Sequence, residues 1–196
     1  MYEEVFQVKS NNIDPHKGRI LIASPLFYDY HFSRSVVLII NKDENGTMGI
    51  VLNKDFRYHI LLSDLIKDVE NMPNIPVGKG GPIGRNALFF VHDIEGIEDA
   101  MDLGNGLFVN GDLEQIVKMI NNGEISDNRI RFYLGYSGWT EEQLDKEIGE
   151  DSWIISELDK EYFFNNEFNG LWRYSLEEMG EPYRTWSAYP IFPSMN

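Results

Sequence analysis

Two apolar segments separated by a short polar turn constrain the fold of this chain more than any other feature. The segments are residues 35–41 (SVVLIIN) and 47–52 (TMGIVL), and the dipeptide Asn45-Gly46 lies between them. Asn and Gly both tolerate the positive φ angles that a two-residue hairpin turn requires. The sequence therefore predicts an antiparallel hairpin over about residues 35–53.

Further short apolar runs predict additional strands along the chain. They lie at residues 20–23, 87–92, 106–110 and 130–134, and residues 153–155 could pair in the same way. These strands come in runs interrupted by single helices, not in strict β-α-β alternation. That order is typical of the α+β class with a mixed or largely antiparallel sheet.

Two segments carry clear helix signals. In residues 112–123, Asp112 stands at the N-cap position before an apolar stripe, and a glycine ends the segment. In residues 140–149, Thr140 begins a capping box of the form T-x-x-Q. Two further helices are expected over residues 63–70, with Ser63 as the N-cap, and 171–179.

The length of 196 residues fits a single domain with a substantial core. We expect that domain to span residues 1–196, with an N-terminal extension at 1–17 and an extended C-terminal tail at 181–196. The absence of cysteine excludes disulfides, thiolate-bound zinc, iron–sulfur clusters and a cysteine nucleophile. The longest aliphatic run has five residues, 36–40, whereas a membrane-spanning helix needs about 20. The first residues also lack the apolar segment of a signal peptide, so we expect a cytoplasmic protein without a membrane partner.

The charge distribution disfavours direct binding to nucleic acid. The net charge is −15, and no basic stripe of the kind that neutralises phosphates is present. Residues 140–196 hold 13 of the 32 Asp and Glu residues but only 4 of the 17 Lys and Arg residues. This acidic region is either a solvated surface or a docking face for a basic partner.

The segment GYSGW at residues 135–139 resembles the nucleophile elbow G-x-S-x-G of hydrolases. The match fails because the second glycine is replaced by Trp139, whose indole would block the close approach that the elbow needs. We expect a turn here, with Trp139 packed on the start of the following helix. Ser137 as a nucleophile also lacks an obvious base, since nothing selects among the scattered histidines at 31, 59 and 92.

Other motifs that could bind ions are incomplete. Residues 41–46 resemble the start of an EF-hand loop, but Leu52 stands where the bidentate glutamate is required. The glycine-rich turn at 79–82 could present backbone N–H groups to an anion, yet it is not a phosphate-binding loop and Pro82 removes one donor. The four histidines have no metal-ligand spacing. We therefore expect neither a metal nor a cofactor.

Several sequence blocks, taken in order, resemble the YqgE/AlgH family of bacterial proteins over about residues 18–180. The most specific block is RFYLGYSGWTEEQLDKEIGEDSW at 131–153. The other blocks are GRILIASP (18–25), FSRSVVLII (32–40), GTMGIVLN (46–53), GGP (80–82) and LFVNGDLEQI (107–116). One departure is Glu142, where the family usually has glycine.

The resemblance implies a fold but no catalytic activity. Proteins of this family have a compact α+β fold, with a branched sheet that is partly curled into a small barrel and helices outside it. Some are labelled transcriptional regulators through a role in alginate regulation. The family offers no agreed catalytic residues, so none is assigned to this chain.

A group of motif residues could line one ligand or partner surface. We expect the protein to be a non-enzymatic binding or interaction module for another protein or a small ligand. The alternatives are a transcriptional regulator and an enzyme of unrecognised class, hydrolase-like, near the 135–139 segment. The sequence leaves the ligand, the partner and the oligomeric state open. The candidate surface residues are Asn53, Gly80, Gly81, Pro82, Ser137, Gly138 and Trp139.

Overall fold

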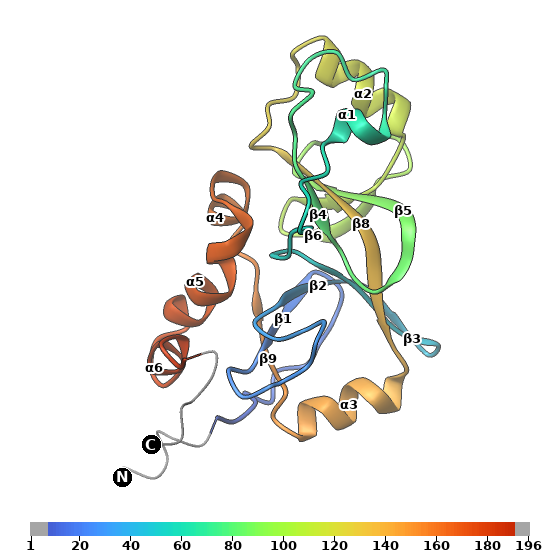
Figure 1. The fold of residues 1–196 in the computed structure, drawn as a ribbon. Coiled ribbons are helices and arrows are strands. Elements are labelled where there is room, and N and C mark those ends of the chain that lie inside the picture. The colour runs from blue at the N-terminus through green and yellow to red at the C-terminus, as the bar shows by residue number, and fades with distance from the viewer. Residues whose placement is uncertain (1–7, 191–196) are drawn as a thin grey trace.

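The predicted hairpin forms as strands β2 (Val36–Asp43) and β3 (Gly46–Val51), which pair antiparallel across a turn at Glu44 and Asn45. The structure, a computed structural model, describes residues 8–190 (Figure 1). The hairpin lies within one larger sheet to which segments from the whole chain contribute. The hairpin predicted over residues 35–53 is therefore confirmed. Its turn lies one residue before the predicted Asn45-Gly46, because Gly46 already pairs with Asp43 as the first residue of β3.

Nine strands of the described chain form this sheet, and it branches at the inner strand β8. The path runs β6-β7-β5-β8-β3-β2-β1-β9, and β4 joins β8 separately and parallel to it. The sheet is thus mixed but largely antiparallel, as expected. The path has two open ends, so the small barrel implied by the family resemblance is not closed. The remaining strands are β1 (Arg19–Ala23), β4 (Val77–Lys79), β5 (Ile83–His92), β6 (Met101–Gly104), β7 (Leu107–Val109), β8 (Ile130–Trp139) and β9 (Trp153–Glu157).

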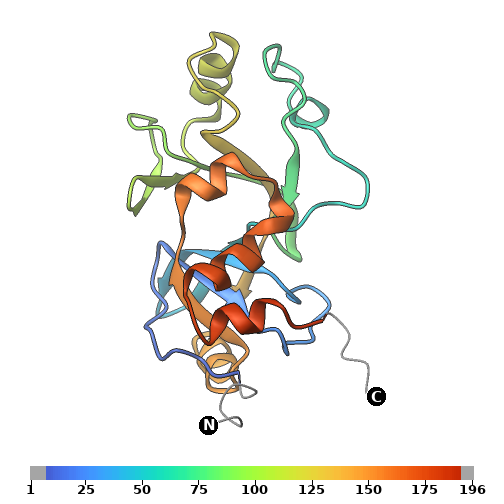
Figure 2. The same ribbon diagram turned by 90° about the vertical axis from the view of Figure 1, so that its left-hand side faces the viewer.

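Helices cover the sheet in three places (Figures 1 and 2). The first two helices lie at one end of the molecule and α3 at the other, while the last three run along one side of the sheet. Asp112 caps α2 and Thr140 caps α3 through side-chain oxygens, as the sequence predicted. The helices are α1 (Leu62–Leu65), α2 (Leu113–Asn121), α3 (Glu141–Gly149), α4 (Lys160–Asn165), α5 (Leu171–Glu178) and α6 (Tyr183–Ser187), with a 3-10 turn at Phe168–Gly170.

Strand β1 shows why these strands are continuously apolar. Ile20 and Ile22 pack into a core that includes residues of α5, whereas Leu21 belongs to a core that includes Leu144 of α3. Because both faces are covered, both sets of alternating side chains are buried. A third core lies beneath α2, where Ile116 joins residues of β5 and β8.

The segment 135–139 is not a turn, which corrects the sequence prediction. It continues β8, which pairs first with β5 and then with β3 through residues 137–139. Gly135 has φ +77°, a conformation open to glycine at little cost, and a register shift in β5 lies opposite this region. The glycine therefore lets the strand bend from one partner to the other without ending.

Two other elements differ from the sequence prediction. The helix expected over 63–70 ends after one turn, and its N-cap is Leu61 rather than Ser63. Ile66 has extended backbone angles, so the chain leaves the helix there. The C-terminal tail is not wholly extended either: residues 183–187 form α6, which buries Trp186 against the body. Residues 191–196 of that tail lie outside the described residues.

The N-terminal extension lies against β9, the edge strand of the sheet. Asn11 donates to the Ile155 carbonyl oxygen at 2.6 Å and accepts from the Ile155 N–H at 3.1 Å. Val8 is buried in the main core. This segment therefore satisfies part of the free edge of β9, which would otherwise offer unpaired backbone groups. Residues 1–7 lie outside the described part of the chain.

Candidate binding site

The motif residues selected from the sequence come together where the 80–82 turn crosses β8. A Cβ added at Gly80 would lie 2.2 Å from the Gly135 carbonyl oxygen, and one at Gly81 would lie 2.1 Å from the Tyr136 carbonyl oxygen. The Gly80 N–H donates to the Leu134 carbonyl oxygen at 2.8 Å. These two glycines therefore allow two backbone segments to touch.

Most of the same group is withdrawn from solvent. Asn53 is buried and bonds to two backbone groups: its Oδ1 accepts from the Val36 N–H at 2.7 Å and its Nδ2 donates to the Arg34 carbonyl oxygen at 2.8 Å. Gly138 is exposed and Pro82 is half-buried. The geometry gives these residues a role in the fold, and their role as a ligand surface stays a prediction.

Trp139 packs on α3, as expected for a residue at the start of that helix. Its Nε1 donates to Glu147 Oε2 at 2.9 Å, and Trp153 Nε1 donates to the same oxygen at 2.7 Å. Phe32 stacks on the Trp139 ring with centroids 5.3 Å apart. One carboxylate therefore satisfies two buried indole donors and fixes α3 to the sheet.

Ser137 is completely buried, and its Oγ has no hydrogen-bond partner within residues 8–190. The Oγ lies 2.6 Å from the position that a Cβ on Gly81 would take, so the glycine turn covers it. A nucleophile must meet both its base and its substrate. The hydrolase-like alternative therefore receives no support from the position of this serine.

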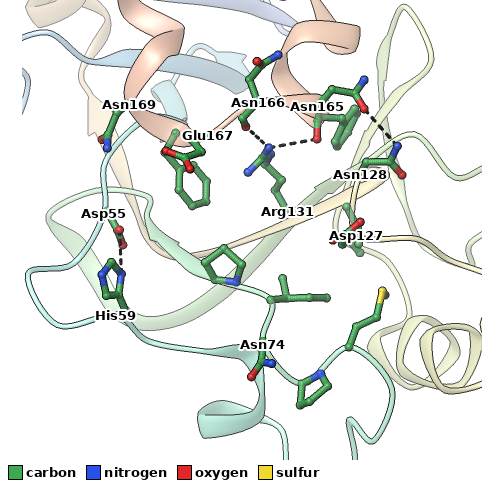
Figure 3. Close-up of a pocket in the computed structure, with 17 residues that line it drawn as sticks. Asp55, His59, Asn74, Asp127, Asn128, Arg131, Asn165, Asn166, Glu167 and Asn169 are labelled. Carbon is green, nitrogen blue, oxygen red and sulfur yellow. Dashed lines mark hydrogen bonds and ion pairs between the residues drawn. The ribbon is translucent and has the colours of Figure 1, made fainter.

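A different place on the molecule is hollowed. A cavity of about 680 Å³ opens between the end of α4 and the loop before β4 (Figure 3). Its lining comes from Asp55 and His59 and from residues within 72–76, 127–131 and 164–169. We call it the Arg131 cavity. Its volume lies in the range of about 300–1,000 Å³ that is usual for ligand pockets.

Arg131 of β8 holds one wall of this cavity in place. Its Nε donates to the Phe163 carbonyl oxygen at 2.9 Å, and its Nη2 donates to the carbonyl oxygens of Phe164, at 3.2 Å, and Asn166. The guanidinium also lies over the ring of Phe168, 4.9 Å from its centroid. These contacts join the C-terminal end of α4 to the central strand, so Arg131 is a positioning residue.

The charge of Arg131 is balanced by dipoles and rings rather than by an ion pair. Burial lowers the pKa of its guanidinium, while Tyr133 and Asp127 act to raise it. Within residues 8–190, no carboxylate lies at ion-pair distance from it. An arginine remains charged even after such a shift, and here the carbonyl oxygens and the Phe168 ring stabilise that charge.

The rest of the lining is rich in carboxamides. Asn128 Nδ2 donates to Asn165 Oδ1 at 3.2 Å, which links the loop before β8 to α4. At the rim, His59 Nδ1 lies 3.3 Å from Asp55 Oδ2. Figure 3 shows these labelled groups on opposite sides of the cavity. The five asparagines of the lining are Asn74, Asn128, Asn165, Asn166 and Asn169.

No motif in the sequence predicted this cavity. Arg131 was visible only as an arginine between apolar residues of a strand, and such a residue marks a buried charge that needs partners. The asparagines at 165, 166 and 169 follow a segment for which no helix was predicted. Without α4, nothing in the sequence brings them next to β8.

The described residues contain no group of three or more His, Cys, Asp or Glu side chains that could hold a metal ion. Over the same residues, no helix has the length and apolar character to span a membrane.

The sequence profile of the AlgH-like family matches residues 20–184. A "UPF0301 protein" of Bacteroides fragilis is 42% identical over 193 residues, covering 98% of this chain and 97% of the relative. The chain belongs to the AlgH-like family. Another AlgH-like relative, a "UPF0301 protein" of Parabacteroides distasonis, is 39% identical and covers 100% of this chain and 98% of the relative. The resemblance found in the sequence blocks is thus confirmed.

Two solved structures share the AlgH-like fold. Protein DIP2367 from Corynebacterium diphtheriae superposes with a TM-score of 0.74 at 21% identity, covering 90% of this chain and 94% of that one. The AlgH protein from Pseudomonas aeruginosa gives 0.68 at 22% identity, with coverages of 92% and 98%. At these identities the likeness establishes the architecture and carries no statement about activity.

Proposed function

We propose that this AlgH-like protein is a cytoplasmic, non-enzymatic binding module whose Arg131 cavity receives an extended, basic segment of a partner protein. The observation that carries the proposal is the cavity itself. It is a preformed hollow whose wall is tied to the central strand by a half-buried arginine, Arg131. A preformed site binds more tightly because less ordering is needed on association.

The lining favours a polypeptide occupant. Each asparagine carboxamide can both donate and accept hydrogen bonds, as a peptide group does. Pro73 and Pro76 lie in the wall segment 72–76, where they lack N–H groups and present apolar rings. A surface that combines such rings with carboxamides suits a backbone that needs both hydrogen bonds and apolar contact.

The charge of the rim favours a basic occupant. Asp127 and Glu167 of the lining are exposed, and Asp55 of the lining is half-buried. The only arginine of the lining, Arg131, already donates to backbone carbonyls. The net charge of −15 adds a long-range attraction for cations. The same charge disfavours direct contact with DNA, so the regulator alternative would require a protein partner.

Selection from a library of ten-residue peptides tests this function. We expect the selected peptides to be enriched in Lys and Arg and their affinity to fall with added salt. The double substitution Asp127→Asn with Glu167→Gln should weaken binding about tenfold, which corresponds to about 1.4 kcal/mol.

The matched control removes two charges elsewhere. Glu141 and Glu142 are exposed on α3, at the other end of the molecule from the cavity loops (Figure 1). Glu141→Gln with Glu142→Gln should leave the affinity unchanged. Selection of acidic peptides, or equal weakening by both double variants, would contradict the proposal.

A further inference from the structure

Three cationic side chains gather near the base of the β2–β3 hairpin in this acidic protein. They are Arg34 before β2, Lys54 after β3 and Lys79 at the end of β4, and all three are half-buried. Among the described residues, none of them forms an ion pair with a carboxylate. In a chain with 32 acidic and 17 basic residues, such a cluster is not expected from composition.

Hydrogen bonds to main-chain carbonyl oxygens connect the segments that carry the three residues. Lys54 Nζ donates to the Ser33 carbonyl oxygen at 2.5 Å, directly beside Arg34. The Lys54 carbonyl oxygen in turn accepts from the Lys79 N–H at 2.9 Å. The buried Asn53 side chain donates to the Arg34 carbonyl oxygen at 2.8 Å. The cluster is therefore built on fixed backbone and not on independent surface side chains.

Arg34 is held in an unusual conformation. Its φ is +53°, in the left-handed region that residues with a Cβ seldom adopt. Its guanidinium lies 4.4 Å from the centroid of the Trp172 ring, and Nη2 donates to the Tyr189 carbonyl oxygen. A backbone outlier that the surroundings enforce is a reason to look for function at that place.

The electrostatics of the cluster are repulsive. Burial lowers the pKa of the Lys54 ammonium, and the charges of Lys79 and Arg34 lower it further. Asp55 follows Lys54 in sequence, but one of its oxygens faces His59 and the other accepts from the Phe56 N–H. A bound anion would relieve this repulsion at three cations together.

We propose that Arg34, Lys54 and Lys79 form a binding site for a small soluble ligand that carries a diphosphate or a comparable group of phosphate charges. Lysine binds phosphate as a point charge, and arginine adds directed N–H donors. The site is separate from the proposed peptide function, because none of the three residues lines the Arg131 cavity.

Calorimetric titration of the whole protein with pyrophosphate tests the site. Lys54→Met and Lys79→Met should each weaken pyrophosphate binding about tenfold, the effect of losing one charge-assisted contact. Lys42→Met is the matched control, since Lys42 is also half-buried but lies at the far end of the hairpin. It should leave binding unchanged. Circular dichroism identifies any variant that fails to fold. If one of the two lysine variants fails to fold, the other is sufficient for the test.

Three results would overturn the proposal. If pyrophosphate produced no binding heat with the unmodified protein, the proposed site would be refuted. Equal weakening by Lys42→Met would show that only the overall charge matters. Binding to vesicles containing phosphatidic acid, without binding to free pyrophosphate, would assign the cluster to a lipid surface instead of a soluble ligand.

Discussion

Arg131 Nε donates a hydrogen bond of 2.9 Å to the carbonyl oxygen of Phe163, which lies 32 residues further along the chain. This bond joins the central strand to α4, and the cavity opens beside it. A half-buried arginine on the strand thus fixes the position of a helix that the sequence did not predict.

The first prediction concerns this contact. Arg131→Met removes all its donors to the three backbone carbonyls of 163–166 and should lower the free energy of unfolding by about 3 kcal/mol. Arg129→Met is the comparison, because Arg129 forms a partly exposed ion pair with Asp93 at 2.8 Å. Its loss should cost about 1 kcal/mol or less. Urea unfolding measures both values, and equal values would contradict the role given to Arg131.

The second prediction concerns the shared carboxylate of α3. Glu147→Ala leaves the indole N–H groups of Trp139 and Trp153 without their acceptor, so the free energy of unfolding should fall by about 2–4 kcal/mol. Glu150→Ala at the C-cap of α3 removes only an exposed pair with Lys146 and should change the free energy of unfolding by less than about 0.5 kcal/mol. Tryptophan fluorescence during unfolding follows the two rings directly. No difference between the variants would refute the shared anchor.

The third prediction is a pH dependence that comes from His92. This histidine is fully buried, and burial lowers the pKa of its imidazole, partly offset by its bond to the Asn110 carbonyl oxygen. The unfolded chain therefore binds a proton more readily than the folded one below about pH 6.5. Stability from this residue should be present above about pH 6.5 and should be lost as the pH falls below it.

An NMR titration of the His92 ring protons checks this sign. The midpoint should lie below the value for an unperturbed histidine. A midpoint at or above that value would show that the buried ring carries its charge, and the predicted loss of stability on acidification would then have another source.

The fourth prediction asks whether the glycine turn at 80–82 serves backbone packing or forms a ligand surface. A Cβ at Gly80 would overlap the Gly135 carbonyl oxygen, so Gly80→Ala should destabilise the fold by about 3 kcal/mol. Gly149→Ala is the control, because it ends a helix with no atom within 4 Å of the added Cβ. Thermal unfolding gives both values. A stable Gly80→Ala protein would contradict the backbone crossing and would favour the ligand-surface prediction for this turn.

Local signals in the sequence predicted much of the fold. Caps at Asp112 and Thr140 act over a few residues, so they could be predicted without tertiary information. The hairpin could be predicted as well, although its turn lies at Glu44 and Asn45, one residue before the predicted Asn45-Gly46. The course of β8 was not readable, because Gly135 indicates a turn until its neighbours in β3 and β5 are known. Long-range pairing decides whether a glycine ends a strand or bends it.

The site was less predictable than the fold for a related reason. The Arg131 cavity is built from residues up to 114 positions apart, and no spacing rule connects Asp55 with Asn169. The residues that the sequence did select, such as Gly81 and Ser137, stand out because backbone packing needs small groups there. A clear sequence motif can thus reflect the needs of backbone packing, whereas the residues that line the open cavity form no recognisable motif.

The most direct test of the proposed function is an NMR titration of the nitrogen-labelled protein with a selected basic peptide. We expect the side-chain amide signals of Asn128, Asn165 and Asn169 to shift with peptide concentration. Shifts confined to Gly80, Gly81 and Gly138, with the cavity asparagines unchanged, would contradict it and move the binding surface to the glycine turn.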